Sequence, residues 1–468
     1  MPFLLVPEEA LALSATAAAV LDLVDGERPL TEIKTQLAAQ FDADPGTVGR
    51  DVDALIADLI EAGHVAAQPA TRKPSSSVAA SVGRTTAEKN PAATSAKPGE
   101  PPSVGPPIAM LAELTHRCPL RCLYCSNPLE LTRRSAELDT AAWARVFKEA
   151  AALGVLQVHI SGGEPAARKD LVEIVASASR AGLYTNLITS GLGLSTATLD
   201  ACARDGLDHV QLSLQALDQA SAATITGHQD PLPAKARVAR ETVALGLPLT
   251  LNTVIHRENI SDVAGLINLA RDWQAERIEI AHTQYHGWAA LNRKHLLPSL
   301  EEISAASDAV DAARRVHGGS MRIDHVKPDH FATYPKACMG GWARTGLVVV
   351  PDGIILPCHS AGTLPGLVFP NVKDTSLEAA WTTSHAFNAY RGTEWMKPPC
   401  RGCPRAEVDF GGCRCQAFAV TGDAAATDPA CSKSPVRLPG PVAARPSASD
   451  KSSQAGRYRG FATQTEDA

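Results

Sequence analysis

The chain has 468 residues, of which 45% are hydrophobic and 20% are charged, as is typical of soluble proteins with more than one domain. Its formal net charge of -6 argues against nucleic acid as a partner, because nucleic acid is usually met by a basic surface. It has no run of about 20 apolar residues and no basic signal-peptide start, so we expect no membrane association and a cytoplasmic location. In the cytoplasm the 11 cysteines are expected to bind metal rather than form disulfides.

Residues 1–66 are predicted to form a small helical unit. Apolar residues such as Ile33, Leu37 and Val52 recur at helical spacing, and Asp44-Pro45-Gly46 marks a break between two helical stretches. The pattern fits three short helices that follow a short N-terminal strand.

Two segments have a composition that cannot bury a core. Residues 67–105 are rich in Pro, Ser, Ala and Thr and carry almost no large apolar side chain, and the residues from about Lys433 onward look similar. Chains of this kind gain too little from burial to offset the entropy lost on ordering. We therefore predict a disordered linker at 67–105 and a disordered tail at 433–468.

From residue 106 to about residue 330 the sequence alternates between strands and helices. The predicted strands are 108–114, 155–160, 184–189, 209–214, 249–255 and 277–282. The predicted helices are 140–152, 170–181, 196–204, 234–245 and 259–273. Six strand–helix repeats predict an α/β fold with a complete or partial parallel barrel, whose chemistry gathers at the C-terminal ends of the strands. Residues 331–432 break the alternation and are rich in Cys, Gly and Pro, so metal is expected to hold them together.

Three cysteines follow the first predicted barrel strand at the spacing C-x3-C-x2-C: Cys118, Cys122 and Cys125. Three thiolates can hold three irons of a [4Fe-4S] cluster and leave the fourth iron open for S-adenosylmethionine (SAM). Zinc is the alternative, but structural zinc normally takes four ligands. The spacing resembles the signature of the radical SAM family, which implies that an electron from the cluster cleaves SAM to a 5'-deoxyadenosyl radical.

The later strand ends carry further residues of the same resemblance. Gly162, Gly163 and Glu164 resemble the motif that binds the SAM amino group, since glycines allow close backbone approach and Glu164 can accept from an ammonium group. By resemblance, Ser190, Ser213 and Gln215 lie near the SAM carboxylate and ribose, and Tyr124 packs on the adenine. Alone, the Gly-Gly-Glu motif could be a turn, the serines and Gln215 could be ordinary polar strand ends, and Tyr124 could be a loop aromatic.

A second field of cysteines lies in the C-terminal part of the chain, and Asp409 stands within it. Its members are Cys338, Cys358, Cys400, Cys403, Asp409, Cys413, Cys415 and Cys431. The order resembles the SPASM extension of radical SAM peptide-modifying enzymes, with Asp409 where the family has a third cysteine. The resemblance implies two auxiliary clusters ([2Fe-2S] or [4Fe-4S]), one held by Cys338, Cys358, Cys413 and Cys415 and the other by Cys400, Cys403, Asp409 and Cys431. The alternatives are zinc, and Asp409 as a helix or turn cap.

Segment 107–432 resembles, nearly end to end, the PqqE family of radical SAM peptide cyclases in pyrroloquinoline quinone biosynthesis, and the N-terminal unit resembles the winged-helix-like PqqD module. The fold class implied is a partial (β/α)6 radical SAM barrel with a Cys-rich SPASM extension, preceded by a PqqD domain. The implied substrate is a PqqA-like precursor peptide, whose leader the PqqD unit would bind in cis. The implied reaction joins the γ-carbon of a Glu to the ring of a Tyr beside its hydroxyl. An external flavodoxin- or ferredoxin-like protein would donate electrons.

Two other functions remain open from the residues alone. Another SPASM peptide maturase, for example one that forms thioethers, would share every cluster motif. An iron–sulfur electron carrier with a peptide-binding module would need no SAM site. His282, Gln284, Tyr285 and His286 follow the sixth strand and are candidate substrate contacts, whereas Cys202, alone on a predicted helix, is expected to be a buried core residue.

Overall fold

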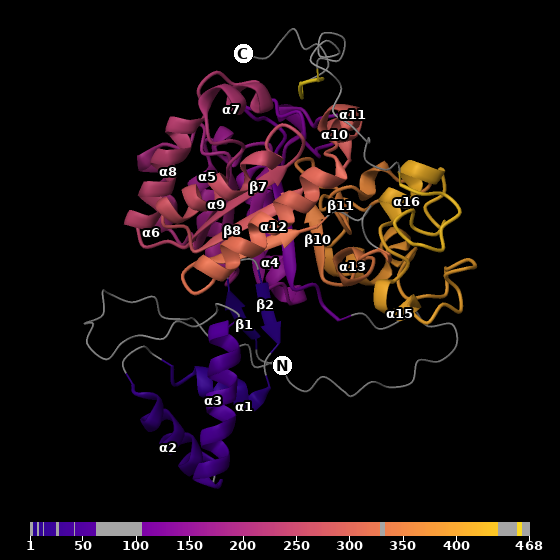
Figure 1. Ribbon diagram of the computed structural model, residues 1–468. Coiled ribbons are helices and arrows are strands. Elements are labelled where there is room, and N and C mark those ends of the chain that lie inside the picture. Colours follow the sequence, from indigo (N-terminus) through magenta and orange to yellow (C-terminus); the bar gives the residue numbers. More distant parts are fainter. Residues whose placement is uncertain are drawn as a thin grey trace. The chain divides into compact units, whose positions relative to one another are not determined.

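The computed structural model describes residues 3–6, 9–12, 14–24, 28–41, 43–61, 105–327, 333–438 and 456–460 (Figure 1). The chain divides into two compact units, one of residues 1–94 with 319–322 and one of residues 95–318 with 323–468. Within the described ranges, no helix combines the length and the apolar character that a membrane span requires. Apart from Gly105, the predicted linker lies outside the described residues.

The N-terminal unit contains three helices, as predicted, and a hairpin in place of the single expected strand. Its elements are β1 (Phe3–Val6), β2 (Glu9–Ala12), α1 (Ala15–Leu21), α2 (Leu30–Gln40) and α3 (Pro45–Glu61). The two strands pair in antiparallel fashion. Val20, Ile33, Leu37 and Val52 form the buried core between the helices. The helical spacing of the apolar residues predicted the last three, but not Val20.

The larger unit is built on a nine-stranded sheet in the order β11-β10-β3-β4-β5-β6-β7-β8-β9. The six predicted strands are all present: β3 (Ala109–Thr115), β4 (Gln157–Gly162), β5 (Tyr184–Thr189), β6 (His209–Ser213), β7 (Leu249–Ile255) and β8 (Arg277–His282). Each is parallel to the next. Apolar runs such as Val158 to Ile160 and Val210 to Leu212 are fully buried at their apolar positions, as expected for a sheet that is covered by helices.

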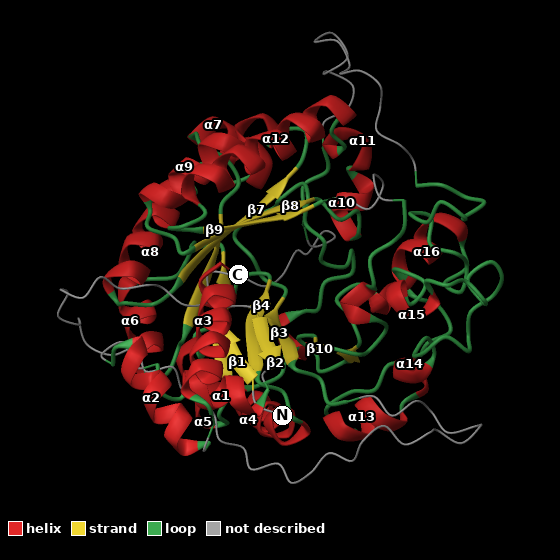
Figure 2. Ribbon diagram, turned by 60° about the horizontal axis from the view of Figure 1, so that its bottom comes forward, coloured by secondary structure: helices red, strands yellow, loops and turns green. Residues whose placement is uncertain are grey.

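Helices surround the strands of this sheet, and Figure 2 shows α6, α8, α9 and α12 on the outside. The five predicted helices are α4 (Thr140–Leu153), α5 (Leu171–Arg180), α6 (Thr196–Arg204), α8 (Leu232–Ala244) and α9 (Val263–Asp272). Four further helices are not among the predicted ones: α7 (Gln219–Thr226), α10 (Gly287–Leu291), α11 (Arg293–Leu296) and α12 (Leu300–His317). A signal for α12 was present, because Ser299 and Glu302 form a capping box at its start.

The cysteine-rich region consists of short elements joined by turns. They are β10 (Gly346–Val349), β11 (Ile355–Leu356), α13 (Leu377–Thr383), α14 (His385–Asn388), α15 (Ala406–Asp409) and α16 (Arg414–Thr421). Strand β10 lies parallel to β3 and joins the barrel sheet, and β9 (Arg322–Val326) extends the sheet beside β8 at its other end. Neither edge was predicted, because strands of four or five residues give little periodic pattern.

The prediction of a disordered tail at 433–468 is wrong for part of that segment. Residues 433–438 continue from the cysteine-rich region, and residues 456–460 are ordered against the barrel. Arg459 is 4% exposed, and Asn292 exchanges two hydrogen bonds with the backbone of Arg457. Composition misses such a segment, because a few specific contacts with a folded surface can order a chain that has no core of its own.

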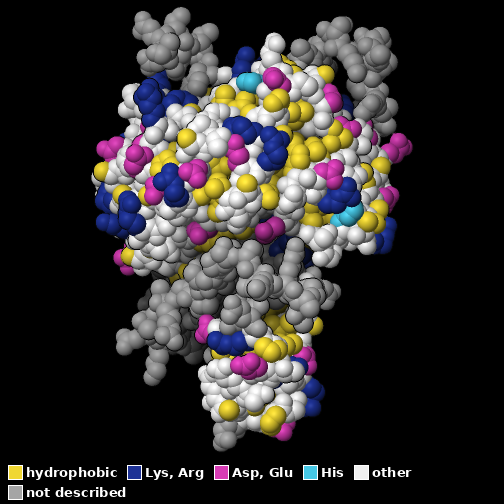
Figure 3. Space-filling model, turned by 90° about the vertical axis from the view of Figure 1, so that its left-hand side faces the viewer, with side chains coloured by type: hydrophobic (Ala, Val, Ile, Leu, Met, Phe, Trp, Pro, Cys, Tyr) yellow, Lys and Arg dark blue, Asp and Glu magenta, His cyan; other side chains and the backbone are white. Residues whose placement is uncertain are grey.

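Charged side chains of both signs are interspersed on the face of the molecule that Figure 3 shows. Lys and Arg alternate with Asp and Glu over the larger unit, with apolar side chains between them. The described part of this face thus carries charges of both signs. This agrees with the overall charge of -6.

Candidate functional site

The three cysteines of the first cluster line one cavity at the C-terminal ends of the barrel strands. The cavity has a volume of about 440 Å³, and its lining includes Cys118, Cys122 and Cys125 from the loop after β3. The loop is held from outside, because the amide N of Arg121 donates to the carbonyl of Thr226 at 2.7 Å. A cavity of this size is within the range of small-molecule sites.

The other predicted SAM-site residues gather at the same cavity, with one exception. Tyr124, Gly162, Gly163, Ser190, Ser213 and Gln215 line it together with the cysteines. The side chain of Gln215 donates to the Tyr124 hydroxyl at 2.9 Å, so these two residues from different elements fix each other. Glu164 is absent from the described lining residues.

Glu164 is buried beneath the cavity, and its carboxylate accepts four hydrogen bonds from protein donors. One oxygen accepts from Ala166 N at 3.1 Å and from Thr189 Oγ1 at 2.8 Å, and the other accepts from Ser190 N at 2.7 Å and Ser190 Oγ at 2.5 Å. Burial raises the pKa of Glu164, and these hydrogen bonds oppose the rise. A carboxylate has about four acceptor sites. In this structure Glu164 therefore orients the ends of β4 and β5 and has no acceptor site left over.

Gly162 and Gly163 let the turn after β4 lie directly against the end of β3. An added Cβ would stand 2.3 Å from the carbonyl oxygen of Thr115 at Gly162, and 2.3 Å from that of Arg117 at Gly163. Gly162 also has a positive φ of 126°. The glycines are thus required for the close approach of two backbone segments. This contact brings the turn against the cysteine loop.

A buried lysine that the sequence analysis missed supports the site from below. Lys235 on α8 is fully buried, and its Nζ donates to the carbonyls of Ser190 at 2.7 Å and Ser213 at 2.8 Å. Burial lowers the pKa of Lys235 to about 8, although the nearby Cys122, Glu164 and Cys118 raise it. Lys235 thereby ties together the ends of β5 and β6.

Glu113, also missed, joins the first cysteine loop to the second cysteine field. The Glu113 carboxylate, at the end of β3, hydrogen-bonds His359 Nδ1, and it contacts His116 Nε2 at 3.3 Å. The other ring nitrogen of His359 lies 3.1 Å from the carbonyl of Ser126. Burial would raise the pKa of Glu113, but the two histidines lower it to about 2. Because His359 follows Cys358, this network spans the two cysteine regions.

The four cysteines assigned to the first auxiliary cluster form a closed ring of contacts. Cys338 and Cys415 each hydrogen-bond both Cys358 and Cys413, and the Sγ atoms of Cys358 and Cys415 lie 3.8 Å apart. The hydrogen bond with Cys338 lowers the pKa of both Cys358 and Cys413. The same contacts raise the pKa of Cys338 and Cys415. Two of the four side chains, Cys358 and Cys413, therefore favour the thiolate form that binds iron.

This ring opens onto a second cavity, which adjoins the first. The second cavity has a volume of about 360 Å³, and Cys338, Cys358 and Cys413 are among its lining residues. Ser126, His282, Gln284, Val326 and His359 line both cavities. Two of the candidate substrate contacts, His282 and Gln284, therefore lie between the two cysteine sites. The other two, Tyr285 and His286, line the second cavity alone.

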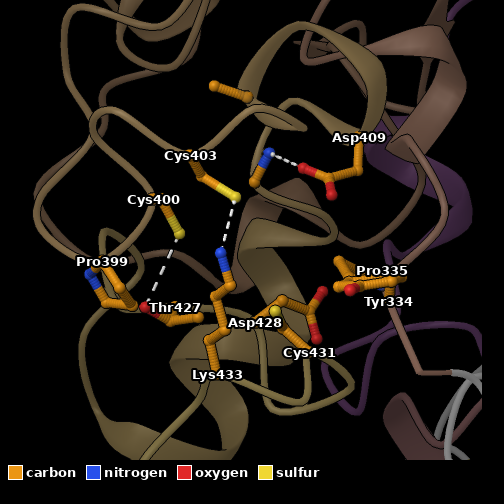
Figure 4. Close-up of a pocket in the computed structure, with 12 residues that line it drawn as sticks. Tyr334, Pro335, Pro399, Cys400, Cys403, Asp409, Thr427, Asp428, Cys431 and Lys433 are labelled. Carbon is orange, nitrogen blue, oxygen red and sulfur yellow. Dashed lines mark hydrogen bonds between the residues drawn. The ribbon is translucent and has the colours of Figure 1, made fainter.

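The remaining four predicted ligands surround a much smaller hollow, shown in Figure 4. Cys400, Cys403, Asp409 and Cys431 line a space of about 20 Å³, close to the size of one water, so a cluster would have to displace these side chains. Lys433 Nζ donates to Cys403 Sγ at 3.2 Å. The three thiols and the carboxylate are donors that suit an iron–sulfur cluster. The space between them is too small for one unless the side chains move.

Asp409 has the cap geometry that was considered as its alternative role. Its Oδ1 accepts from Gly411 N at 3.1 Å, and its Oδ2 accepts from Arg405 Nε at 3.3 Å. A carboxylate retains further lone pairs beyond these two bonds. Across the described residues, no three Cys, His, Asp or Glu side chains are arranged to hold a single metal ion.

Three family models match the chain. The model described as Radical SAM superfamily matches residues 112–270, Coenzyme PQQ synthesis protein D (PqqD) matches residues 3–65, and Iron-sulfur cluster-binding domain matches residues 338–404. The three matches follow the order of the regions described above.

The fold is similar to that of crystal structures of SuiB from Streptococcus suis. The SAM-bound structure has a TM-score of 0.59 at 16% identity and covers 88% of this chain and 92% of SuiB. The structure bound to precursor peptide SuiA has a TM-score of 0.58 with the same identity and coverage. At this identity the similarity shows the fold alone.

Relatives with high sequence identity are PqqA peptide cyclases. The protein of Methylocella silvestris is 60% identical over 329 residues, which cover 70% of this chain and 88% of the relative. The protein of Rhizobium meliloti is 53% identical over 348 residues, which cover 74% and 93%. The chain therefore belongs to the PqqA peptide cyclase family of radical SAM enzymes and carries a PqqD region in the same polypeptide.

Proposed function

We propose that this enzyme joins the γ-carbon of a Glu to the ring carbon beside the hydroxyl of a Tyr in a PqqA-like precursor peptide. The observation that carries the proposal is the cavity of about 440 Å³ that three cysteines share with the ends of β4, β5 and β6. Family membership supports the substrate, since the relatives are PqqA peptide cyclases.

Cys118, Cys122 and Cys125 would hold a [4Fe-4S] cluster with one iron open to SAM. When bound, the two supply a carbon radical that can remove hydrogen from an unactivated carbon. Tyr124, Ser190, Ser213 and Gln215 would contact SAM from their positions on the lining, as would the backbone of Gly162 and Gly163. Glu164 would act through Ser190, which it hydrogen-bonds twice.

The second cysteine field would hold two auxiliary clusters. Cys338, Cys358, Cys413 and Cys415 would bind one, and their ring of contacts supports this set. Cys400, Cys403, Asp409 and Cys431 would bind the other. The cross-link removes one hydrogen from each partner, and the first set lies on a cavity that adjoins the SAM site, so it would accept an electron from the substrate. A flavodoxin- or ferredoxin-like protein would reduce the cluster held by Cys118, Cys122 and Cys125.

The regions of the chain would divide the work. Residues 1–66 would bind the leader of the precursor, 67–105 would tether this module, 106–330 would form the catalytic barrel, and 331–432 would carry the auxiliary clusters. A leader held on the same chain raises the effective concentration of the peptide core at the barrel.

A labelled peptide tests the reaction. The enzyme, SAM and reductant are incubated without oxygen with a cysteine-free PqqA-like peptide that carries deuterium on the γ-carbon of its Glu. We expect a loss of two hydrogens from the peptide as a whole, with deuterium recovered in 5'-deoxyadenosine and a Glu–Tyr link in tandem mass spectra. The γ-carbon carries two deuterium atoms and abstraction removes one of them, so a cross-linked peptide that retains both would contradict abstraction at that carbon.

A second peptide separates this reaction from thioether formation. Replacing the Tyr by Phe removes the ring hydroxyl that directs and activates the addition, so we expect 5'-deoxyadenosine but no cross-link. A product that forms only when a cysteine is present in the peptide would instead indicate a thioether-forming maturase.

A further inference from the structure

The C-terminal segment Gly456–Gly460 docks on the outside of the first cysteine loop. Arg459 N donates to the carbonyl of Arg121 at 3.2 Å, and Arg121 Nε donates back to the carbonyl of Arg459 at 3.0 Å. Arg121 lies between Cys118 and Cys122 in sequence. The segment therefore pairs with the backbone that carries the cluster ligands.

The neighbouring residues of the segment fasten it at further points. Asn292 donates to the carbonyls of Leu123 at 2.8 Å and Arg457 at 2.7 Å, so one buried amide joins loop and segment. The Tyr458 ring packs against the apolar cluster that contains Leu123. The Arg121 guanidinium lies over this ring, with its Cζ 5.7 Å from the ring centroid. The Tyr458 hydroxyl donates to the carbonyl of Thr224 at 2.7 Å.

Arg459 then reaches through the loop to the cavity. Its side chain lines the cavity with the three cysteines, hydrogen-bonds the carbonyl of His116 and is 4% exposed. Its Nε is buried without a hydrogen-bond partner. The positive charge of Arg459 thus lies on the cavity wall with the three thiols, and its side chain hydrogen-bonds Cys125.

We propose that Arg459 is a positioning residue of the radical SAM site, held by the docked segment so that its positive charge stabilises the anionic cluster and its thiolate ligands. The inference rests on the cofactor site proposed above. A cluster gains negative charge on reduction, and its potential depends on nearby charge. The guanidinium therefore makes the first cluster easier to reduce. It does not touch the auxiliary sites, whose ligands come from other loops.

The test is the midpoint potential of the first cluster in the full-length enzyme. Its electron paramagnetic resonance signal is identified by its change when SAM is added, and it is followed through a redox titration. We expect Arg459→Gln to shift the potential to a more negative value and Arg459→Lys to restore most of the shift. Arg457→Gln is the matched control, because Arg457 is exposed and docks through its backbone. An unchanged potential in Arg459→Gln, or an equal shift in Arg457→Gln, would overturn the proposal.

Hydrogen–deuterium exchange tests the docking without any cluster. In the metal-free full-length chain, Tyr458→Ala is expected to speed amide exchange in residues 121–125, since the ring contacts and the bond to Thr224 are lost. Arg457→Gln should leave exchange at the wild-type rate. Unchanged exchange in Tyr458→Ala would show that the segment does not hold the loop. This result would stand even if the chain failed to cyclise a peptide, so the two proposals can fail separately.

Discussion

The two cysteine regions of this chain place their thiols beside spaces of very different size. Cys118, Cys122 and Cys125 lie on a loop between regular elements and face a cavity of about 440 Å³. Cys400, Cys403 and Cys431 lie on turns around a hollow of about 20 Å³. The first site has room for a small molecule beside its thiols, whereas the second has space for about one water. Both sites have three thiols, so the surrounding fold rather than the number of thiols sets the space beside them.

The difference follows from what holds each region in place. The first loop is fixed by the barrel, since Glu164, Lys235 and the two glycines order the strand ends around it. The second field has only short helices and strands, so its own ligands must supply much of its stability when metal binds. The barrel keeps a cavity open beside its three thiols. In the extension, the set around Cys400 encloses a small hollow, whereas Cys338, Cys358 and Cys413 line the second cavity of about 360 Å³.

The largest expected effect comes from removing a thiol of the open site. Cys118→Ala should abolish formation of 5'-deoxyadenosine from SAM and leave the signals of the C-terminal clusters in place, because the two regions use separate ligands. Product is measured by chromatography and the clusters by iron analysis and spectroscopy. Cys202→Ala is the control, since Cys202 is buried in a helix away from both regions. Retained SAM cleavage in Cys118→Ala would contradict the assignment of the first cysteine loop as the site of SAM cleavage.

The closed site can be tested at Asp409, where two roles are possible. If Asp409 binds iron, Asp409→Asn should lose iron from one auxiliary cluster, because the neutral amide is a weaker ligand, whereas Asp409→Cys should keep it. If Asp409 only caps the turn at Gly411, Asp409→Asn should keep the full iron content, since Asn caps as well as Asp. Iron and sulfide counts on oxygen-free protein decide between the two.

The link between the two regions should depend on pH. Burial lowers the pKa of His359, but the Glu113 carboxylate overcomes this and raises it to about 9. A raised histidine pKa stabilises the fold fully below about pH 6.5, and this contribution is lost as pH rises through about 9. In metal-free protein, His359→Gln should lower the free energy of unfolding by up to about 3 kcal/mol near pH 6 and by much less at pH 10. A difference that stays constant in denaturant titrations across this range would contradict the ion pair.

Gly163, in the turn after β4, lies so close to the segment after β3 that we expect no side chain to be tolerated there. In Gly163→Ala the added methyl group would stand 2.3 Å from the carbonyl oxygen of Arg117, which requires backbone movement and should cost about 2 kcal/mol of stability. Gly362→Ala, with its nearest neighbour 3.8 Å away, should change stability little. Denaturant unfolding of both variants gives the comparison.

The smallest effect is expected at Glu164, which acts through its neighbours. Glu164→Gln keeps the shape but replaces one acceptor oxygen by a donor, so Ser190 loses part of its orientation. We expect about a tenfold weaker SAM affinity, measured by equilibrium binding, in line with the loss of one charge-assisted hydrogen bond. Glu173→Gln, an exposed position on α5, should bind SAM as the wild type does. A loss larger than a hundredfold would instead indicate direct contact between Glu164 and SAM.

Much of the barrel and of its site could be predicted from local pattern. The strands from β3 to β8 are short runs rich in buried apolar residues, and their ends carry Gly162, Ser190 and Ser213 at one edge because parallel strands end together. Family membership also excludes the electron-carrier alternative, since the relatives are enzymes. Lys235, Glu113 and Arg459 escaped prediction, because each acts on residues far away in sequence and leaves no periodic signal.

The sequence by itself determined the strands, most of the barrel helices and the three thiols of the first loop, because spacing and periodicity are local properties of the chain. Only the tertiary structure decided that Glu164 lies beneath the cavity, that the two cavities share His282 and Gln284, and that Arg459 returns to the first loop. Contacts of this kind depend on the folded surface as a whole, where residues more than 300 positions apart meet.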